Sequence, residues 1–238
     1  MVRFFLLVLV LTSTAYGQGR FDDRYRQELF EMASQNHYSV GSYRYARKVV
    51  IQELHLKQDN QGYFVRDVYC QKFFRRNVGP NRMPSHNEIN IEHTWPQSRF
   101  NNGMSKGMQK VDLHHLFPSD SRSNSSRGNL YFSQFSKDAR AVYGDCNASK
   151  MGRISETGAN GFEPPLEHKG NVARALFYFS IRYKIRIPAY EEFFLRQWHL
   201  IDPVDADEIE RNDTIEKFQG NRNPFVDDPQ LTDLITDF

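Results

Sequence analysis

The 238-residue sequence has little of several features that define whole classes of protein. It contains only two cysteines, too few for a small disulfide-rich scaffold or a cysteine-rich zinc module. With 39% hydrophobic and 25% charged residues, its composition excludes a disordered low-complexity chain and a collagen-like repeat. A chain of this length can bury a core as one large domain or as two small ones.

Long apolar runs are also absent, apart from one near the N-terminus. Residues 1–17 combine an arginine, an apolar run over residues 4–11 and small residues near their end. This pattern is typical of a secretory signal peptide cleaved before Gln18, and the run is far shorter than the roughly 20 residues that span a bilayer. A buried N-terminal helix is the alternative. We expect export, one domain over residues 18–238, and no membrane association after cleavage.

Export changes what the two cysteines, Cys70 and Cys146, imply. An oxidising compartment favours a disulfide between them. Such a bond would close a loop of about 75 residues and stabilise the fold by about 4 kcal/mol in the chain-entropy model. Two buried thiols are the alternative.

The chain lacks a large excess of one charge sign, since its net charge is +2, but the charges are unevenly placed. Residues 20–186 hold 26 basic and 16 acidic side chains, whereas residues 187–238 hold 4 and 13. A basic body suits an anionic polymer as partner, because phosphate contacts release counterions. The acidic C-terminal quarter either forms a solvated helix face or packs on the basic body away from the substrate.

The periodicity of apolar residues predicts an α+β fold that is predominantly helical. Helices are expected over residues 22–36, 42–57, 119–129, 169–187, 188–200 and 204–218, with Ser119 or Asp120 capping the third. Residues 90–95 and 111–117 are expected to be extended, ended by Pro96 and Pro118, residues 63–74 to be a strand or mixed segment, and residues 147–165 to be a loop.

Two of these extended segments and the polar helix after them carry the candidate chemistry. Glu92 offers a carboxylate oxygen and Asn124 an amide oxygen, which are ligands for Mg²⁺ or Ca²⁺ rather than for zinc. His93 offers a neutral imidazole, which can take a proton from water. Glu92 and His93 would point to opposite faces of a regular strand, so they can face one site only if the strand twists, bulges or ends there.

The motifs in this order resemble the endonuclease I family, exported bacterial nucleases of the ββα-metal (His-Me finger) class. The resemblance rests on E-H-x-x-P from Glu92, D-L-H-x-L-x-P from Asp112, N-x-x-R-x-N from Asn124 and the segment 219–225. It extends over roughly residues 22–226 and implies a central ββα-metal motif with surrounding helices. The segment 219–225 is expected to be a structural loop that ties the acidic C-terminal region to the body.

The resemblance also implies roles for individual residues. His93 would be the general base, and Glu92 and Asn124 the two protein ligands of a single Mg²⁺, with Ca²⁺ and Mn²⁺ as alternative ions. Asn124 is preferred to Asn129 because it falls in the first turn of the expected helix. Family members cut DNA and RNA with little sequence preference, which fits binding through the phosphate backbone. We expect the chain to act as a monomer.

The arginine that contacts the scissile phosphate is harder to assign. Family members with a long cysteine-containing insertion after the Glu-His motif carry that arginine in the insertion, which this chain lacks. Arg99 is predicted as the catalytic replacement and Arg127 as the second candidate, with a phosphate-positioning or solvent-facing arginine as the alternative for each. Arg122, Arg127 and Lys110 are further expected to bind nucleic acid.

Three functions are compared. The sequence favours a secreted or periplasmic, Mg²⁺-dependent endonuclease without sequence specificity. A non-catalytic exported nucleic-acid-binding protein on a nuclease fold is the main alternative, and it would shift DNA on a gel without cleaving it. Another class of metallohydrolase, such as a peptidase, lacks support because the sequence has no His-Glu-x-x-His motif and no set of cysteine ligands.

Overall fold

The computed structural model of the chain describes residues 23–135 and 139–238. The predicted signal peptide, residues 1–17, lies outside these described residues. The first described helix covers residues 23–34. The others are α2 (Tyr43–Val49), which continues into a π-helical turn (Val50–Leu54), α3 (Lys106–Val111), α4 (Ser121–Arg127), α5 (Leu166–Tyr183), α6 (Ala189–Ile201), α7 (Ala206–Gln219) and α8 (Pro224–Asp227).

The strands form three small sheets. The first joins β1 (Lys57–Asp59), β2 (Gly62–Arg66) and β3 (Phe73–Phe74), and the second pairs β4 (Ile89–His93) with β5 (Leu116–Asp120). The third contains β6 (Tyr131–Phe132), β7 (Arg140–Tyr143), β8 (Cys146–Arg153) and β9 (Asn160–Glu163) in the order β6-β9-β8-β7. Helices and strands together confirm the predicted α+β class.

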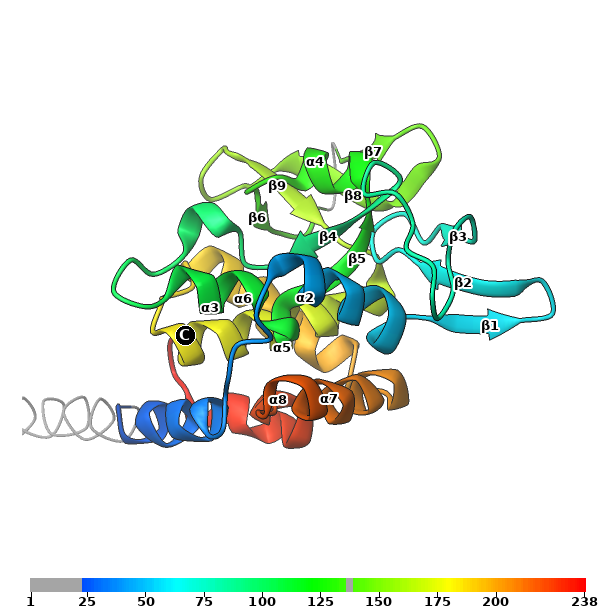
Figure 1. Cartoon of the computed structure of the whole chain (residues 1–238). Coiled ribbons are helices and arrows are strands. Elements are labelled where there is room, and N and C mark those ends of the chain that lie inside the picture. Colours follow the sequence, from blue (N-terminus) through cyan, green and yellow to red (C-terminus); the bar gives the residue numbers. More distant parts are fainter. Residues whose placement is uncertain (1–22, 136–138) are drawn as a thin grey trace, which may run out of the picture.

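Figure 1 shows how these elements are layered. The four-stranded sheet and α4 lie at the top of the view, α5 and α6 lie in the middle, and α7 and α8 lie at the bottom. The three-stranded sheet extends to the right (Figure 1). Across the described residues, no helix has both the length and the apolar character needed to cross a bilayer.

The core is centred on α5, which is buried on nearly every side. Its side chains Val172, Leu176, Phe177 and Phe179 are at most 2% exposed. Helix α6, α8 and the 3₁₀ turn Leu113–His115 pack around it. Buried charges on α5 are paired, Lys169 with Glu163 and Arg174 with Glu208 at 2.6 Å each, so the helix can be buried without leaving these charges uncompensated. The confirmed prediction here is the long helix, observed a few residues earlier than expected.

The paired strands β4 and β5 and the helix α4 form one local unit. The strands are antiparallel, with Ile89 opposite Asp120 and His93 opposite Leu116. Helix α4 follows β5 directly and contacts both strands. Asp120 is its N-cap, because its carboxylate accepts hydrogen bonds from the amides of Arg122 and Ser123. The sequence had predicted either Ser119 or Asp120 as the N-cap, and the structure identifies Asp120.

Three sequence predictions about local structure are wrong. Pro118 does not end a strand, because it lies inside β5 opposite Ile91; a two-stranded sheet leaves one edge of each strand unpaired, where proline is tolerated. The segment 111–117 begins as the end of α3 and a 3₁₀ turn, and becomes extended only at Leu116. Residues 147–165 contain most of β8 and all of β9 rather than a loop, because pairing with neighbours outweighs their weak strand propensity.

Candidate active site

Three segments bring the predicted site residues into one region. The end of β4 carries Glu92 and His93, and the last turn of α3 carries Lys110. Helix α4 carries Asn124 and Arg127. Direct contacts join these segments, since α4 packs on β4 and the backbone of Lys110 reaches the side chain of His93.

The carboxylate of Glu92 is buried and paired. Glu92 is 1% exposed, and its Oε1 accepts a hydrogen bond from the Tyr69 hydroxyl at 3.0 Å and lies 2.7 Å from Nη1 of Arg127. Burial raises the pKa of Glu92 to about 7, while the charge of Arg127 and the Tyr69 hydrogen bond act in the opposite direction. A further positive charge beside this carboxylate would therefore favour its ionised form.

Arg127 fastens α4 to the end of β4. Its guanidinium donates to the carbonyl oxygens of His93 at 2.9 Å and Thr94 at 2.6 Å, and it covers the ring of Phe132 at 4.4 Å. Arg127 is 1% exposed, so in this conformation its guanidinium interacts with Glu92 and with backbone carbonyls rather than with solvent. Nucleic-acid binding by Arg127 stays a prediction.

The imidazole of His93 is held in one tautomer. Its Nε2 lies 3.0 Å from the carbonyl oxygen of Lys110, and a carbonyl can only accept, so Nε2 carries the proton and Nδ1 is the acceptor. The side-chain amide of Gln97 lies 3.4 Å from Nδ1, and the ring of Tyr43 stacks on the imidazole at 5.6 Å. Burial lowers the pKa of His93 to about 4, which keeps the ring neutral at neutral pH.

Asn124 is half-buried on α4, beside β4. Its Nδ2 donates to the carbonyl oxygen of Ile91 at 3.3 Å, which leaves the amide oxygen Oδ1 for another partner. Among the described contacts, none joins the side chain of Asn124 to that of Glu92 or His93. Strand β4 ends at His93, one of the three conditions under which Glu92 and His93 can face a common site. Their shared use with Asn124 stays a prediction.

The arginines predicted to contact phosphate have other partners in this structure. Nη2 of Arg99 donates to the carbonyl oxygens of Asn129 at 2.5 Å and Leu130 at 3.2 Å. The same guanidinium covers the ring of Tyr131 at 3.8 Å and lies 3.8 Å from Glu191. Exposed Arg122 covers the ring of Tyr143 at 4.2 Å. Their predicted catalytic and binding roles remain predictions.

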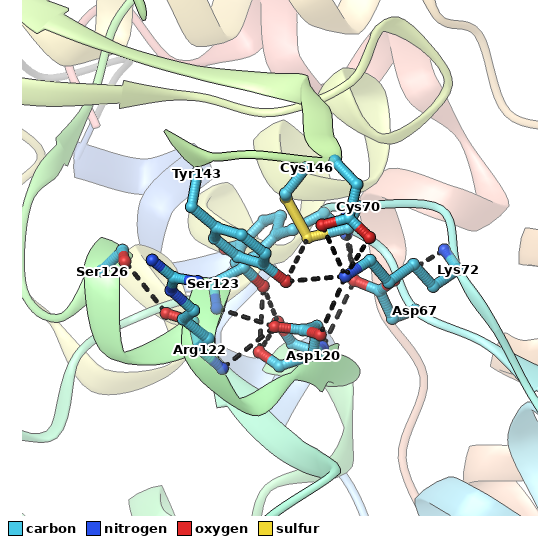
Figure 2. A network of polar contacts seen from close by, with 12 residues as sticks. Asp67, Cys70, Lys72, Asp120, Arg122, Ser123, Ser126, Tyr143 and Cys146 are labelled. Atoms are coloured by element: carbon cyan, nitrogen blue, oxygen red, sulfur yellow. Dashed lines mark hydrogen bonds and ion pairs between the residues drawn. A yellow bond between two sulfur atoms is a disulfide. The ribbon is translucent and has the colours of Figure 1, made fainter. Parts of the chain in front are cut away.

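The disulfide between Cys70 and Cys146 is present, as predicted. Figure 2 shows how it connects to the cap of α4. Asp67 accepts hydrogen bonds from several backbone amides of its own loop and from the amide of Asp120 at 3.3 Å. The ammonium of Lys72 lies 3.6 Å from the carboxylate of Asp120. The cross-linked loop therefore supports both Tyr69, the hydrogen-bond partner of Glu92, and the N-terminus of α4.

The sequence did not predict that Tyr43, Tyr69 and Gln97 contact the predicted site residues directly. Tyr43 and Tyr69 come from segments far from the motifs, and nothing local marks them. Gln97 follows the E-H-x-x-P motif directly, so its proximity was the one available signal. Within residues 23–135 and 139–238, no group of three or more His, Cys, Asp or Glu side chains is arranged to hold a metal ion.

Comparison with known proteins gives one family model and several relatives that are all nucleases. The family model described as Endonuclease I matches residues 22–230. An extracellular ribonuclease of Bacillus subtilis (strain 168) is 35% identical over 164 residues, which are 61% of this chain and 53% of the relative. A periplasmic deoxyribonuclease of Aeromonas hydrophila is 33% identical over 132 residues, 54% of this chain and 53% of the relative.

A third relative, an Endonuclease-1 of Buchnera aphidicola subsp. Baizongia pistaciae (strain Bp), is 30% identical over 173 residues, 66% of each chain. The chain thus spans about half the length of the ribonuclease and deoxyribonuclease relatives.

Proposed function

The chain belongs to the endonuclease I family, and we propose that it is an exported endonuclease that hydrolyses phosphodiester bonds of DNA and RNA without sequence preference. Its relatives include an extracellular ribonuclease and extracellular and periplasmic deoxyribonucleases. The basic body over residues 20–186 supports binding through the phosphate backbone. The predicted signal peptide supports a secreted or periplasmic location.

The observation that carries the proposal is the arrangement around His93. Donation from Nε2 to the carbonyl oxygen of Lys110 fixes the tautomer, so that Nδ1 presents a lone pair. A general base requires a neutral imidazole with a lone pair that can take a proton, and here that lone pair meets the side-chain amide of Gln97 at 3.4 Å. Gln97, the hydrogen-bond neighbour of Nδ1, is exposed, so this side of the ring is within reach of solvent and substrate.

We further propose that β4, β5 and α4 form the ββα-metal motif of this family. The order of the elements, their antiparallel pairing and the packing of α4 on both strands support this assignment. The donor set fits Mg²⁺, because the carboxylate of Glu92 and the amide oxygen of Asn124 are hard oxygen ligands. The raised pKa of Glu92 also fits a metal ligand, because a bound cation would stabilise the ionised form of this buried carboxylate.

In the proposed reaction, Nδ1 of His93 takes a proton from a water molecule while the water oxygen attacks phosphorus. The bond between phosphorus and O3′ breaks, and the leaving 3′ oxygen takes a proton from solvent. The products are a 5′-phosphate and a 3′-hydroxyl. Arg127 favours the ionised form of Glu92 and holds the end of β4 in place. Mg²⁺ held by Glu92 and Asn124 would supply positive charge to the phosphorane and the leaving oxygen.

The test is digestion of single- and double-stranded DNA and RNA by the mature chain with Mg²⁺, Mn²⁺ or Ca²⁺, and with a chelator. We expect cleavage at many sequences, 5′-phosphate ends by mass spectrometry, and loss of cleavage in the chelator. A gel shift of DNA without cleavage under every condition would instead support the non-catalytic binding protein.

A further inference from the structure

The cations on the segments that contact His93 differ in whether their charge is already paired. Arg99 is bonded to two backbone carbonyls and lies near Glu191. Arg127 is paired with Glu92 and buried. Arg47 donates to the carbonyl oxygens of Pro84 at 2.8 Å and Ile89 at 3.3 Å. None of these three guanidiniums can turn to a phosphate without breaking contacts inside the protein.

Lys110 is different. Its backbone carbonyl holds Nε2 of His93 at 3.0 Å, while its side chain is exposed. Its ammonium lies 5.3 Å from the centre of the Tyr43 ring, and that ring stacks on His93 at 5.6 Å. Within the described part of the chain, the ammonium has no carboxylate partner and no hydrogen bond. The Tyr43 ring therefore keeps an uncommitted positive charge beside the candidate base.

We propose that the ammonium of Lys110 contacts the scissile phosphate and stabilises the negative charge that grows on its non-bridging oxygens as water attacks. This role rests on the proposed nuclease function, and it makes Lys110 rather than Arg99 the cation that contacts the scissile phosphate. Tyr43 is a positioning residue, because its ring contacts Lys110 and His93 rather than the phosphate. A charge aimed at developing charge accelerates the chemical step more than it tightens ground-state binding.

Lys110 thus has two separate functions in the proposed site. The carbonyl of Lys110 fixes the tautomer of His93, and its ammonium supplies charge to the phosphate. The two functions can be separated, because substituting the side chain leaves the carbonyl in place. Lys110→Met removes only the charge, and Lys110→Arg keeps a charge of different shape. Lys106, four residues earlier on α3 and also exposed, is the matched control.

The experiment measures kcat and KM on a DNA duplex with Mg²⁺ for the wild type, Lys110→Met, Lys110→Arg and Lys106→Met, with circular dichroism to verify folding. We expect kcat of Lys110→Met to fall roughly 10²-fold, as for loss of one electrostatic contact to a transition state. Lys110→Arg should recover at least a tenth of the wild-type kcat, and Lys106→Met should leave kcat within about twofold.

A double-mutant cycle tests the part played by Tyr43. Tyr43→Leu keeps an apolar side chain but removes the ring face, so it should lower kcat about tenfold in the wild type. In the Lys110→Met background its further effect should be clearly smaller than tenfold, because the contact with the ammonium is already lost and only the stacking on His93 remains to be removed. Tyr43→Phe keeps the ring and should leave kcat within about threefold.

The outcomes separate this inference from the function it rests on. If the wild type cleaves DNA but Lys110→Met changes only KM, or changes nothing, Lys110 is at most a backbone-binding cation and the proposal is overturned. Equal kcat losses in Lys106→Met and Lys110→Met would also overturn it. Absence of cleavage by the wild type on every substrate and ion would instead remove the nuclease function itself.

Discussion

Gln219 and Asp112 are 107 residues apart in the sequence, and Nε2 of Gln219 donates a hydrogen bond to Oδ1 of Asp112 at 2.8 Å. The amide oxygen of the same glutamine accepts from the backbone amide of Leu113 at 2.8 Å. Oδ2 of Asp112 accepts from the hydroxyls of Tyr178 at 2.9 Å and Tyr183 at 2.8 Å. The segment 219–225 is therefore bonded to the turn that leads into β5, as expected, but it is a loop only at residues 220–223, because Gln219 ends α7 and Pro224 begins α8.

Gln219→Ala should destabilise the fold by about 2–4 kcal/mol, because it leaves the buried amide of Leu113 and one oxygen of Asp112 without that partner. Guanidinium unfolding measures the change. Exposed Gln230, whose backbone amide is bonded to Asp228, is the control, and Gln230→Ala should change stability by less than about 0.5 kcal/mol. Similar unfolding curves for the two variants would contradict the structural role of Gln219.

The metal assignment is tested by comparing two asparagines of one motif. Asn124→Ala should weaken Mn²⁺ binding at least tenfold, since it removes one of the two proposed protein ligands. Asn129→Ala should not, because Asn129 lies beyond the end of α4 and its side chain is exposed. Electron paramagnetic resonance of free Mn²⁺ gives the affinity without any turnover. Equal affinities in the two variants would remove Asn124 from the metal site.

The acid sensitivity of the fold depends on buried histidines such as His168. Burial, followed by the charges of Arg211 and Arg174, lowers the pKa of His168 to about 3. Unfolding then takes up a proton between about pH 6.5, its ordinary pKa, and pH 3. The contribution of His168 to stability is thus complete above pH 6.5 and is lost as pH falls.

Removal of this group gives a direct check. Between pH 6 and pH 4, the free energy of unfolding of the wild type should fall faster than that of His168→Leu, by up to about 1.4 kcal/mol per pH unit. Leucine suits the apolar surroundings, which include the rings of Phe117 and Tyr69. Denaturant titrations at pH 7, 6, 5 and 4 measure both slopes, and parallel slopes would show that His168 is not held neutral.

The parts of the fold that the sequence predicts are those controlled by local pattern. The period of apolar residues located α5, α6 and α7 to within a few residues. Turn and cap chemistry placed the start of α4 at Asp120 or its neighbour. The disulfide was predictable because the chain has a single cysteine pair and a predicted signal peptide. Strands β8 and β9 were missed, because their stability comes from partner strands rather than from their own residues.

The candidate site was also predictable only in part. The motifs identified Glu92, His93 and Asn124 as chemical groups, but not what surrounds them. The pairing of Glu92 with Arg127 joins β4 to α4, and the stacking of Tyr43 on His93 joins two further segments. Contacts of this kind depend on tertiary packing, and the local periodicity of a single sequence does not reveal them. The sequence also could not show which arginines are already paired inside the protein, because pairing depends on the folded structure and not on the position in a motif.

The central claim, that His93 is the base of a phosphodiester-cleaving enzyme, is tested most directly by the rate of DNA cleavage in Mg²⁺ for His93→Ala. Exposed His86 is the matched control. We predict that His93→Ala stays folded and loses roughly 10²–10⁴-fold in kcat, while His86→Ala keeps the wild-type rate within about twofold. A His93→Ala enzyme that cleaves DNA as fast as the wild type would contradict the account.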